Sequence, residues 1–438
     1  MWYYTEDKYF FHVPLTLNFK SPDRAMSINQ HVQNVIRNNP EVNIIGLDRG
    51  ERNLLYLTLI NQKGEILKQK SFNVVEHTGS NGRCVKTDYH GKLKDREADR
   101  DRARKSWDSI GKIKDLKEGY LSAVIHEIVT LMLENNAIIV LEDLNFGFKR
   151  GRFCVERQVY QKFEKMLIDK LNYLSLKTRL ITEPGGILKG YQLTEKFESF
   201  QKLGKQSGAL FYVPAAYTSK IDPTTGFTNL FNLKKCTNAR ERKAFFEQFD
   251  AICYDATRKA FAFTFDYDKF KTSQTSYQTK WTVYSAEMRL TYNRAEQEHQ
   301  VIHPTQMIKD ALETLGYRIE DNLDVLRIVK EMGADVKTAR FFSELFYAFE
   351  RTLQMRNSDT TRDYIESPVE NQEGVRFDTR NQTESSHLPC DADANGAYHI
   401  ALKGLWMLKH LPEKEKTPLP KLEHAQWLEF MQRKAWLH

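Results

Sequence analysis

Three acidic residues stand where a strand ends or a helix begins, a placement that suits metal-dependent chemistry. Asp48 and Glu142 each follow a short apolar run typical of a buried strand. Asp393 belongs to an Asp-Ala-Asp-Ala-Asn-Gly segment that opens a predicted helix of small and apolar residues. If the two strands are neighbours and the helix packs across them, the three carboxylates converge.

Such a convergence has an electrostatic cost that only cations or protons can offset. At ~5 Å and an effective dielectric constant of ~20, each like-charge pair costs about 3 kcal/mol. Three ionised groups then cost on the order of 10 kcal/mol, comparable with the stability of a whole domain. Oxygen ligands favour Mg²⁺, with Mn²⁺ as a second choice, over zinc. Because two such ions suit phosphodiester hydrolysis, the pattern predicts a metal-dependent nuclease.

Each residue taken alone also has a purely structural interpretation. Asp48 is compatible with a simple turn, Glu142 with a solvated strand end, and Asp393 with a helix N-cap, a position that Asp suits well. His399 lies one helical turn after this segment, and we expect it to be structural. Arg356 follows a predicted amphipathic helix, where a lone arginine either holds a phosphate or lies on the surface.

The elements around these residues predict an α/β core. Residues 44–47, 53–60 and 65–72 form three successive predicted strands separated by turns, which indicates an antiparallel meander. Apolar residues at helical spacing from Tyr120 to Met132 predict an amphipathic helix. The run 137–141 is apolar on both faces and follows that helix, as a buried parallel strand does.

The rest of the chain changes character. Residues 183–222 are rich in Gly, Pro and aromatics, which predicts loops, and short aromatic strands with further helices to about 390 indicate an inserted α+β module. The other predicted elements are strands over 9–20, 261–267 and 281–285 and helices over 27–38, 94–105, 157–177, 305–316, 322–332 and 337–356. The highly charged 94–105 segment fits either a solvated helix or one that follows a phosphate backbone.

Composition narrows the class of protein. The 438 residues are 41% hydrophobic, and 65 basic against 58 acidic residues give a charge of +7, which permits a nucleic-acid partner. Five scattered cysteines contain no CxxC pair, so neither a zinc ribbon nor a disulfide framework is expected. Without an 18-residue apolar stretch or a secretory signal, we expect no membrane contact and a cytoplasmic location.

The acidic segments resemble the RuvC motifs of type V-A CRISPR RNA-guided DNA endonucleases, the Cpf family. The first motif is similar to Ile45-Gly-Leu-Asp-Arg-Gly-Glu-Arg-Asn-Leu54, the second to Val140-Leu-Glu-Asp-Leu-Asn-Phe-Gly-Phe148, and the third to the segment from Asp391 to Gly404. Further stretches match between them: Ser106-Trp107 with 113–120, 160–171, 211–226 and 353–358. The resemblance covers nearly the whole chain.

This resemblance implies an RNase H-like (RuvC) core interrupted by an inserted α+β Nuc domain, with a short N-terminal β segment of the wedge domain. It divides the chain into 1–38 as the end of the wedge domain, 39–88 as RuvC-I, 89–106 as the bridge helix, 107–213 as RuvC-II, 214–390 as the Nuc domain and 391–438 as RuvC-III. In the family, Trp107 inserts into a recognition lobe. Because that lobe has no counterpart here, we expect Trp107 to be exposed or repacked.

The resemblance also implies roles for the site residues. Asp48, Glu142 and Asp393 correspond to the catalytic carboxylates that bind two Mg²⁺ ions, or Mn²⁺. Asp391 corresponds to a non-catalytic neighbour. Arg356 corresponds to the Nuc arginine, which helps to place the target strand at the catalytic centre.

The implied partners are CRISPR guide RNA and target DNA, bound through recognition and wedge parts that this sequence lacks, and single-stranded DNA. We therefore expect a monomeric prokaryotic cytoplasmic protein that carries the cutting site but performs no guided cleavage by itself. Two alternatives remain open: a non-enzymatic nucleic-acid-binding fragment, and a compact transposon-type RuvC nuclease.

Overall fold

The computed structural model describes most of the chain after the first 26 residues. The described ranges are 27–39, 41–49, 53–78, 84–92, 113–143, 154–174, 182–186, 192–200, 208–293, 298–359, 361–412 and 419–434, with a few isolated residues between them. The predicted strand over 9–20, most of the charged segment 94–105 and Trp107 lie outside the described residues. Within those ranges, no helix has the length and hydrophobicity to cross a membrane.

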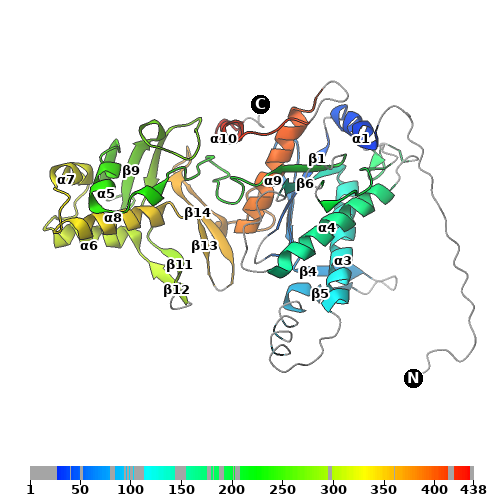
Figure 1. The fold of residues 1–438 in the computed structure, drawn as a ribbon, viewed down its shortest axis with the longest axis horizontal. Helices are drawn as coiled ribbons and strands as arrows, with labels where there is room; N and C mark the ends of the chain where they lie inside the picture. Colours follow the sequence, from blue (N-terminus) through cyan, green and yellow to red (C-terminus); the bar gives the residue numbers. More distant parts are fainter. Residues whose placement is uncertain are drawn as a thin grey trace, which may run out of the picture.

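A mixed five-stranded sheet forms the centre of the fold, in the order β3-β2-β1-β6-β7 (Figure 1). Its strands are β1 (Asn43–Asp48), β2 (Tyr56–Ile60), β3 (Ile66–Ser71), β6 (Ala137–Asp143) and β7 (Leu210–Pro214). β1, β2 and β3 are antiparallel neighbours, whereas β6 runs parallel to both β1 and β7. The predicted meander, the buried parallel strand and the α/β class are thus confirmed.

Helices cover the sheet on both sides. α9 (Ala392–Lys409) packs on β1 and β2, while α3 (Ile113–Glu134) and α4 (Cys154–Tyr173) pack together on the opposite side of the sheet (Figure 1). The remaining elements of this region are α1 (Ile28–Arg37), the hairpin of β4 (Val74–Thr78) and β5 (Cys84–Asp88), and α10 (His424–Gln432).

Close contact between α9 and β1 depends on glycine. A Cβ atom built on Gly46 of β1 would lie 2.1 Å from the carbonyl oxygen of Ala397 and 2.5 Å from the amide nitrogen of Ala401. On the helix side, a Cβ on Gly404 would lie 2.4 Å from Cγ2 of Val140. The two backbones therefore approach each other more closely than any other residue at position 46 permits.

The segment between β7 and α9 forms its own set of small sheets and helices, on the left in Figure 1. Its sheets are β10-β9-β8, β11-β12 and β13-β14-β15. The strands are β8 (Ala251–Asp255), β9 (Ala260–Asp266), β10 (Lys280–Tyr284), β11 (Arg289–Asn293), β12 (Glu298–Ile302), β13 (Arg356–Ser358), β14 (Asp363–Glu370) and β15 (Arg376–Asp378). The helices are α5 (Ala239–Phe246), α6 (Pro304–Thr314), α7 (Val325–Glu331) and α8 (Ala339–Thr352). We call residues 222–390 the insertion.

Two predictions of local structure need correction. The loop-rich reading of residues 183–222 missed β7, whose five residues pair with β6 although Gly and Pro surround them. α8 ends at Thr352 rather than at 356, so Arg356 begins strand β13 instead of following the helix directly.

Candidate active site

The ends of two parallel strands bring Asp48 and Glu142 to one edge of the sheet. Leu47 of β1 pairs with Leu141 of β6, so the next residue of each strand is one of these acids. The start of α9 covers them: a Cβ on Gly396 would lie 2.1 Å from Oδ2 of Asp48. Asp393 stands one turn before that glycine and is 1% exposed.

The charges of Glu142 and Asp393 act on Asp48. Burial raises the pKa of Asp48 well above its usual value, and the negative charges of Glu142 and Asp393 raise it further. The Arg356 guanidinium and the amide of Arg49 oppose this rise, and that amide donates to Oδ1 of Asp48 at 2.8 Å. The charges of Glu142 and Asp393 thus lie within electrostatic range of Asp48, while the binding of a metal by the three carboxylates stays a prediction.

Glu142 is oriented from two directions. The Thr218 hydroxyl donates to its Oε1 at 2.6 Å. Burial raises the pKa of Glu142, against the effects of Thr218, Lys403 and Arg49. Nη2 of Arg49 also donates to the Glu142 carbonyl oxygen at 3.0 Å, and the same guanidinium forms a buried ion pair with Glu164.

Both carboxylate oxygens of Asp393 are bonded. Oδ2 accepts from the side-chain amide of Asn53 at 2.9 Å and from its backbone amide at 3.3 Å. Ser71 and Asn73 each donate to Oδ1 of Asn53 at 2.9 Å, which fixes the orientation of this amide. Oδ1 of Asp393 accepts from Arg356 at 2.8 Å.

Arg356 connects the insertion with the carboxylates. Its Nη2 pairs with Asp363 at 2.7 Å and with Asp393 at 2.8 Å. Burial acts to lower the pKa of Arg356, but the two carboxylates outweigh it and raise the pKa. The guanidinium therefore stays charged beside the acidic cluster.

The comparison with protein families agrees with this arrangement. The family model for the RuvC nuclease domain matches residues 23–436. The chain belongs to this family. It is thus a nuclease with a RuvC-type, RNase H-like fold, and the cluster described above lies at the edge of the RuvC sheet.

We call the described residues before 222 and after 390 the RuvC sheet region. Two other candidate residues of this region have structural surroundings. Asp391 caps α9, where its side chain accepts from the amide of Ala394 at 2.6 Å, and burial raises its pKa to about 7. His399 is fully buried, with Nδ1 2.7 Å from the carbonyl oxygen of Asn395, and burial lowers its pKa to about 3. His399 is therefore neutral at physiological pH.

The donor set of the RuvC cluster fits a hard divalent cation by chemistry. Asp48, Glu142 and Asp393 offer only oxygen, and their mutual repulsion is what a cation relieves. In the described part of the chain, no three His, Cys, Asp or Glu side chains are arranged closely enough to form a ready ligand group. The ion pair between Asp393 and Arg356 would have to adjust when a cation binds.

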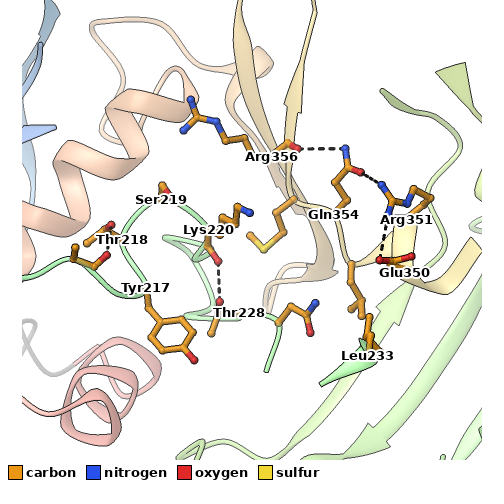
Figure 2. A pocket seen from close by; sticks show the side chains of 14 residues that line it. Tyr217, Thr218, Ser219, Lys220, Thr228, Leu233, Glu350, Arg351, Gln354 and Arg356 are labelled. Atoms are coloured by element: carbon orange, nitrogen blue, oxygen red, sulfur yellow. Dashed lines mark hydrogen bonds and ion pairs between the residues drawn. The ribbon is translucent and has the colours of Figure 1, made fainter. Parts of the chain in front are cut away.

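A pocket of about 560 Å³ adjoins the cluster (Figure 2). Thr218, which binds Glu142, and Arg356, which binds Asp393, are both part of its wall. Figure 2 shows Thr218 and Ser219 on one side, Arg351 with Glu350 on the other, and Lys220 between them. Three cationic side chains and one carboxylate line the pocket, so it carries a net positive charge.

Sequence reasoning did not assign roles to the residues that orient the carboxylates. Asn53 lies inside the first motif, yet its contact with Asp393 spans 340 positions of the chain. Thr218 reaches Glu142 across 76 positions from a region predicted to be loops. Arg49 directly follows Asp48. Its position next to a predicted metal ligand was the one signal in the sequence that could have indicated its role at the site.

Proposed function

We propose that this RuvC nuclease is the catalytic part of a type V-A CRISPR RNA-guided DNA endonuclease and hydrolyses DNA phosphodiesters with Mg²⁺. The observation that carries the proposal is the buried cluster of Asp48, Glu142 and Asp393 with Arg356 beside it. The likeness of three ordered motifs to the Cpf family supports the narrower assignment.

The same resemblance supports an assignment of regions and partners. Residues 214–390 would be the Nuc domain, with the wedge remnant at 1–38 and the bridge helix at 89–106. Guide RNA, target DNA and single-stranded DNA would be the partners of a monomer in the prokaryotic cytoplasm.

The mechanism assigns tasks to residues already described. Asp48, Glu142 and Asp393 would hold the Mg²⁺ or Mn²⁺ ions, which when bound supply an activated water and charge stabilisation at the phosphate. Thr218 and Asn53 keep the carboxylates of Glu142 and Asp393 in fixed orientations. Arg356, whose guanidinium pairs with Asp363 and Asp393, would bind a phosphate of the substrate by charge-assisted hydrogen bonds.

The adjoining pocket supports a nucleic-acid substrate. Its volume lies within the range of small-ligand sites, and its net positive charge suits a phosphodiester chain. Lys220 and Arg351 are separated from Arg356 along the wall, so they would contact phosphates flanking the scissile one. A single strand satisfies this arrangement because its backbone can bend into the pocket.

The test is cleavage of a labelled single-stranded DNA by the purified chain with Mg²⁺, with and without EDTA. We expect strand cleavage that EDTA abolishes. A salt titration of DNA binding in EDTA measures the electrostatic contribution independently. Binding without metal-dependent cleavage would contradict the proposal and favour a non-enzymatic nucleic-acid-binding protein.

A further inference from the structure

Lys403 is a buried cation that the family motif contains but that no role described so far explains. It lies on α9, ten residues after Asp393, and is 1% exposed. Its Nζ donates to the carbonyl oxygens of Pro214 at 2.5 Å and Ala216 at 2.7 Å. Its burial is costly, because desolvation penalises the charge and lowers the pKa of Lys403 to about 7, against the opposite effect of the Glu142 charge.

The two carbonyl groups belong to the segment that orients Glu142. Pro214 ends β7, beside the end of β6 that carries Glu142. Four residues later, Thr218 donates its hydroxyl hydrogen to Glu142. Lys403 therefore fixes the backbone between the edge of the sheet and Thr218, whose hydroxyl hydrogen-bonds to this carboxylate.

The segment 214–218 needs such support. Tyr217 has a φ angle of +56°, a left-handed conformation that side chains other than glycine rarely adopt. A residue in this conformation persists only where its surroundings hold it. The indole of Trp427 donates to the Tyr217 carbonyl oxygen at 2.8 Å, and Lys403 holds the preceding carbonyls. The same Lys403 ammonium lies over the Trp427 ring, 5.2 Å from its centre.

We propose that Lys403 is a positioning residue for Glu142, acting through the 214–218 segment and Thr218. This inference rests on the proposed role of Glu142 as a metal ligand. Since α9 also carries Asp393, one helix sets the positions of two carboxylates, one directly and one through its lysine. A divalent cation is the ligand class whose binding depends on that relative placement.

Mn²⁺ binding by the full chain, measured by calorimetry without nucleic acid, tests the proposal. Replacing Lys403 by Met removes both hydrogen bonds and keeps the length of the side chain. We expect about tenfold weaker Mn²⁺ binding, the size typical of residues that orient metal ligands. A purely electrostatic role predicts the opposite sign, because removal of a positive charge near Glu142 favours a bound cation. Unchanged or tighter binding would therefore overturn the proposal.

A double-substitution cycle tests the route through Thr218. We expect Thr218→Val to weaken Mn²⁺ binding by a similar factor, and the double variant to bind within about threefold of the weaker single variant. If the two effects multiply, or if Thr218→Val alone changes nothing, Lys403 does not act through this hydroxyl. Lys409→Met, an exposed lysine on the same helix, is the matched control and should bind Mn²⁺ as the wild type does.

Two further measurements keep the test decisive. Circular dichroism establishes that each variant is folded, and Lys403→Gln, which retains a shorter donor, replaces the methionine variant if that one is not. Glu142→Gln is the reference and should weaken Mn²⁺ binding more than any other variant. Unchanged affinity in Glu142→Gln would contradict the proposed function itself, whereas a loss there without a loss at Lys403 would overturn only the positioning role.

Discussion

The RuvC sheet region and the insertion each bury a distinctive cluster of side chains, although the insertion also buries Arg289 in an ion pair with Glu366. Under α9, the sheet region encloses charged groups, among them Asp393 and Lys403, each tied by directional hydrogen bonds. The insertion encloses aromatic rings, such as Phe231, Phe249 and Phe349, whose centres lie 5.3–6.3 Å apart.

This difference separates the sources of stability and of function. Ring packing is largely non-directional and gains free energy from apolar area, so the insertion is stable without any defined chemistry. Buried charges cost free energy unless they are paired, and the buried carboxylates of the candidate site lie where the proposed reaction requires them. At the edge of the insertion, Arg356 forms an ion pair with Asp393 of the sheet region and so connects the two regions.

The largest expected effect concerns the carboxylates. Asp48→Ala and Glu142→Ala should each lower the rate of Mg²⁺-dependent DNA cleavage by at least about 10³-fold, or about 4 kcal/mol of transition-state stabilisation. The fold should survive, because each change removes a repulsive charge. Gel assays of labelled DNA measure the rate, and a variant that retains more than a tenth of the activity would remove that carboxylate from the proposed machinery.

The insertion should respond in the opposite way. Phe349→Ala removes a ring from the aromatic core and should cost about 3–5 kcal/mol of unfolding free energy. Denaturant titration measures this loss. Mn²⁺ affinity of the folded variant should stay at the wild-type value, and a parallel loss of metal binding would show that the two regions are not independent.

Arg356 tests the link between the regions. Arg356→Ala should reduce the cleavage rate by about 10–100-fold, the worth of one charge-assisted phosphate contact. Mn²⁺ affinity should be unchanged or higher, because Asp393 loses a competing cation. Arg258, an exposed arginine that pairs with Glu370 in the insertion, provides the control, since Arg258→Ala should leave both quantities unchanged. Weaker Mn²⁺ binding in Arg356→Ala would contradict this assignment.

Charge repulsion in the cluster predicts a stability effect. In EDTA, the free energy of unfolding of Asp48→Asn should exceed that of the wild type by about 1–3 kcal/mol, because burial and two neighbouring charges raise the pKa of Asp48. Mn²⁺ should raise the midpoint of the wild type through binding to the folded state. The variant should show a much smaller Mn²⁺ response, and an equal response would place the ion elsewhere.

The smallest expected effect concerns Asp391 and pH. Its folded-state pKa of about 7 lies above the ordinary value of 3.8, so its contribution to stability is lost as pH rises through this interval. Asp391→Asn lacks that loss and retains a helix-capping side chain. Thermal unfolding should show nearly equal stability at pH 4 and an advantage for the variant at pH 8. An advantage independent of pH would contradict burial of the ionised carboxylate.

Short-range patterns predicted the frame of the candidate site but not the residues that orient it. Apolar runs located the strands that end at Asp48 and Glu142, since burial on both faces leaves a direct mark in the sequence. β7 escaped because a run of five residues among glycines and prolines has little periodicity. The contacts of Asn53, Thr218 and Lys403 follow from strand order and helix placement, which no local pattern contains.

The close approach of α9 to β1 means that the glycines of this interface affect the geometry of the candidate site, although they carry no functional group. A Cβ atom at position 46 would clash with the backbone of Ala397 and Ala401, so the helix that carries Asp393 would have to shift. One at position 396 would push directly on the Asp48 carboxylate. The distance between the carboxylates of Asp48 and Asp393 therefore depends on glycines at the interface of α9 and β1, because larger residues there would separate the helix from the strand.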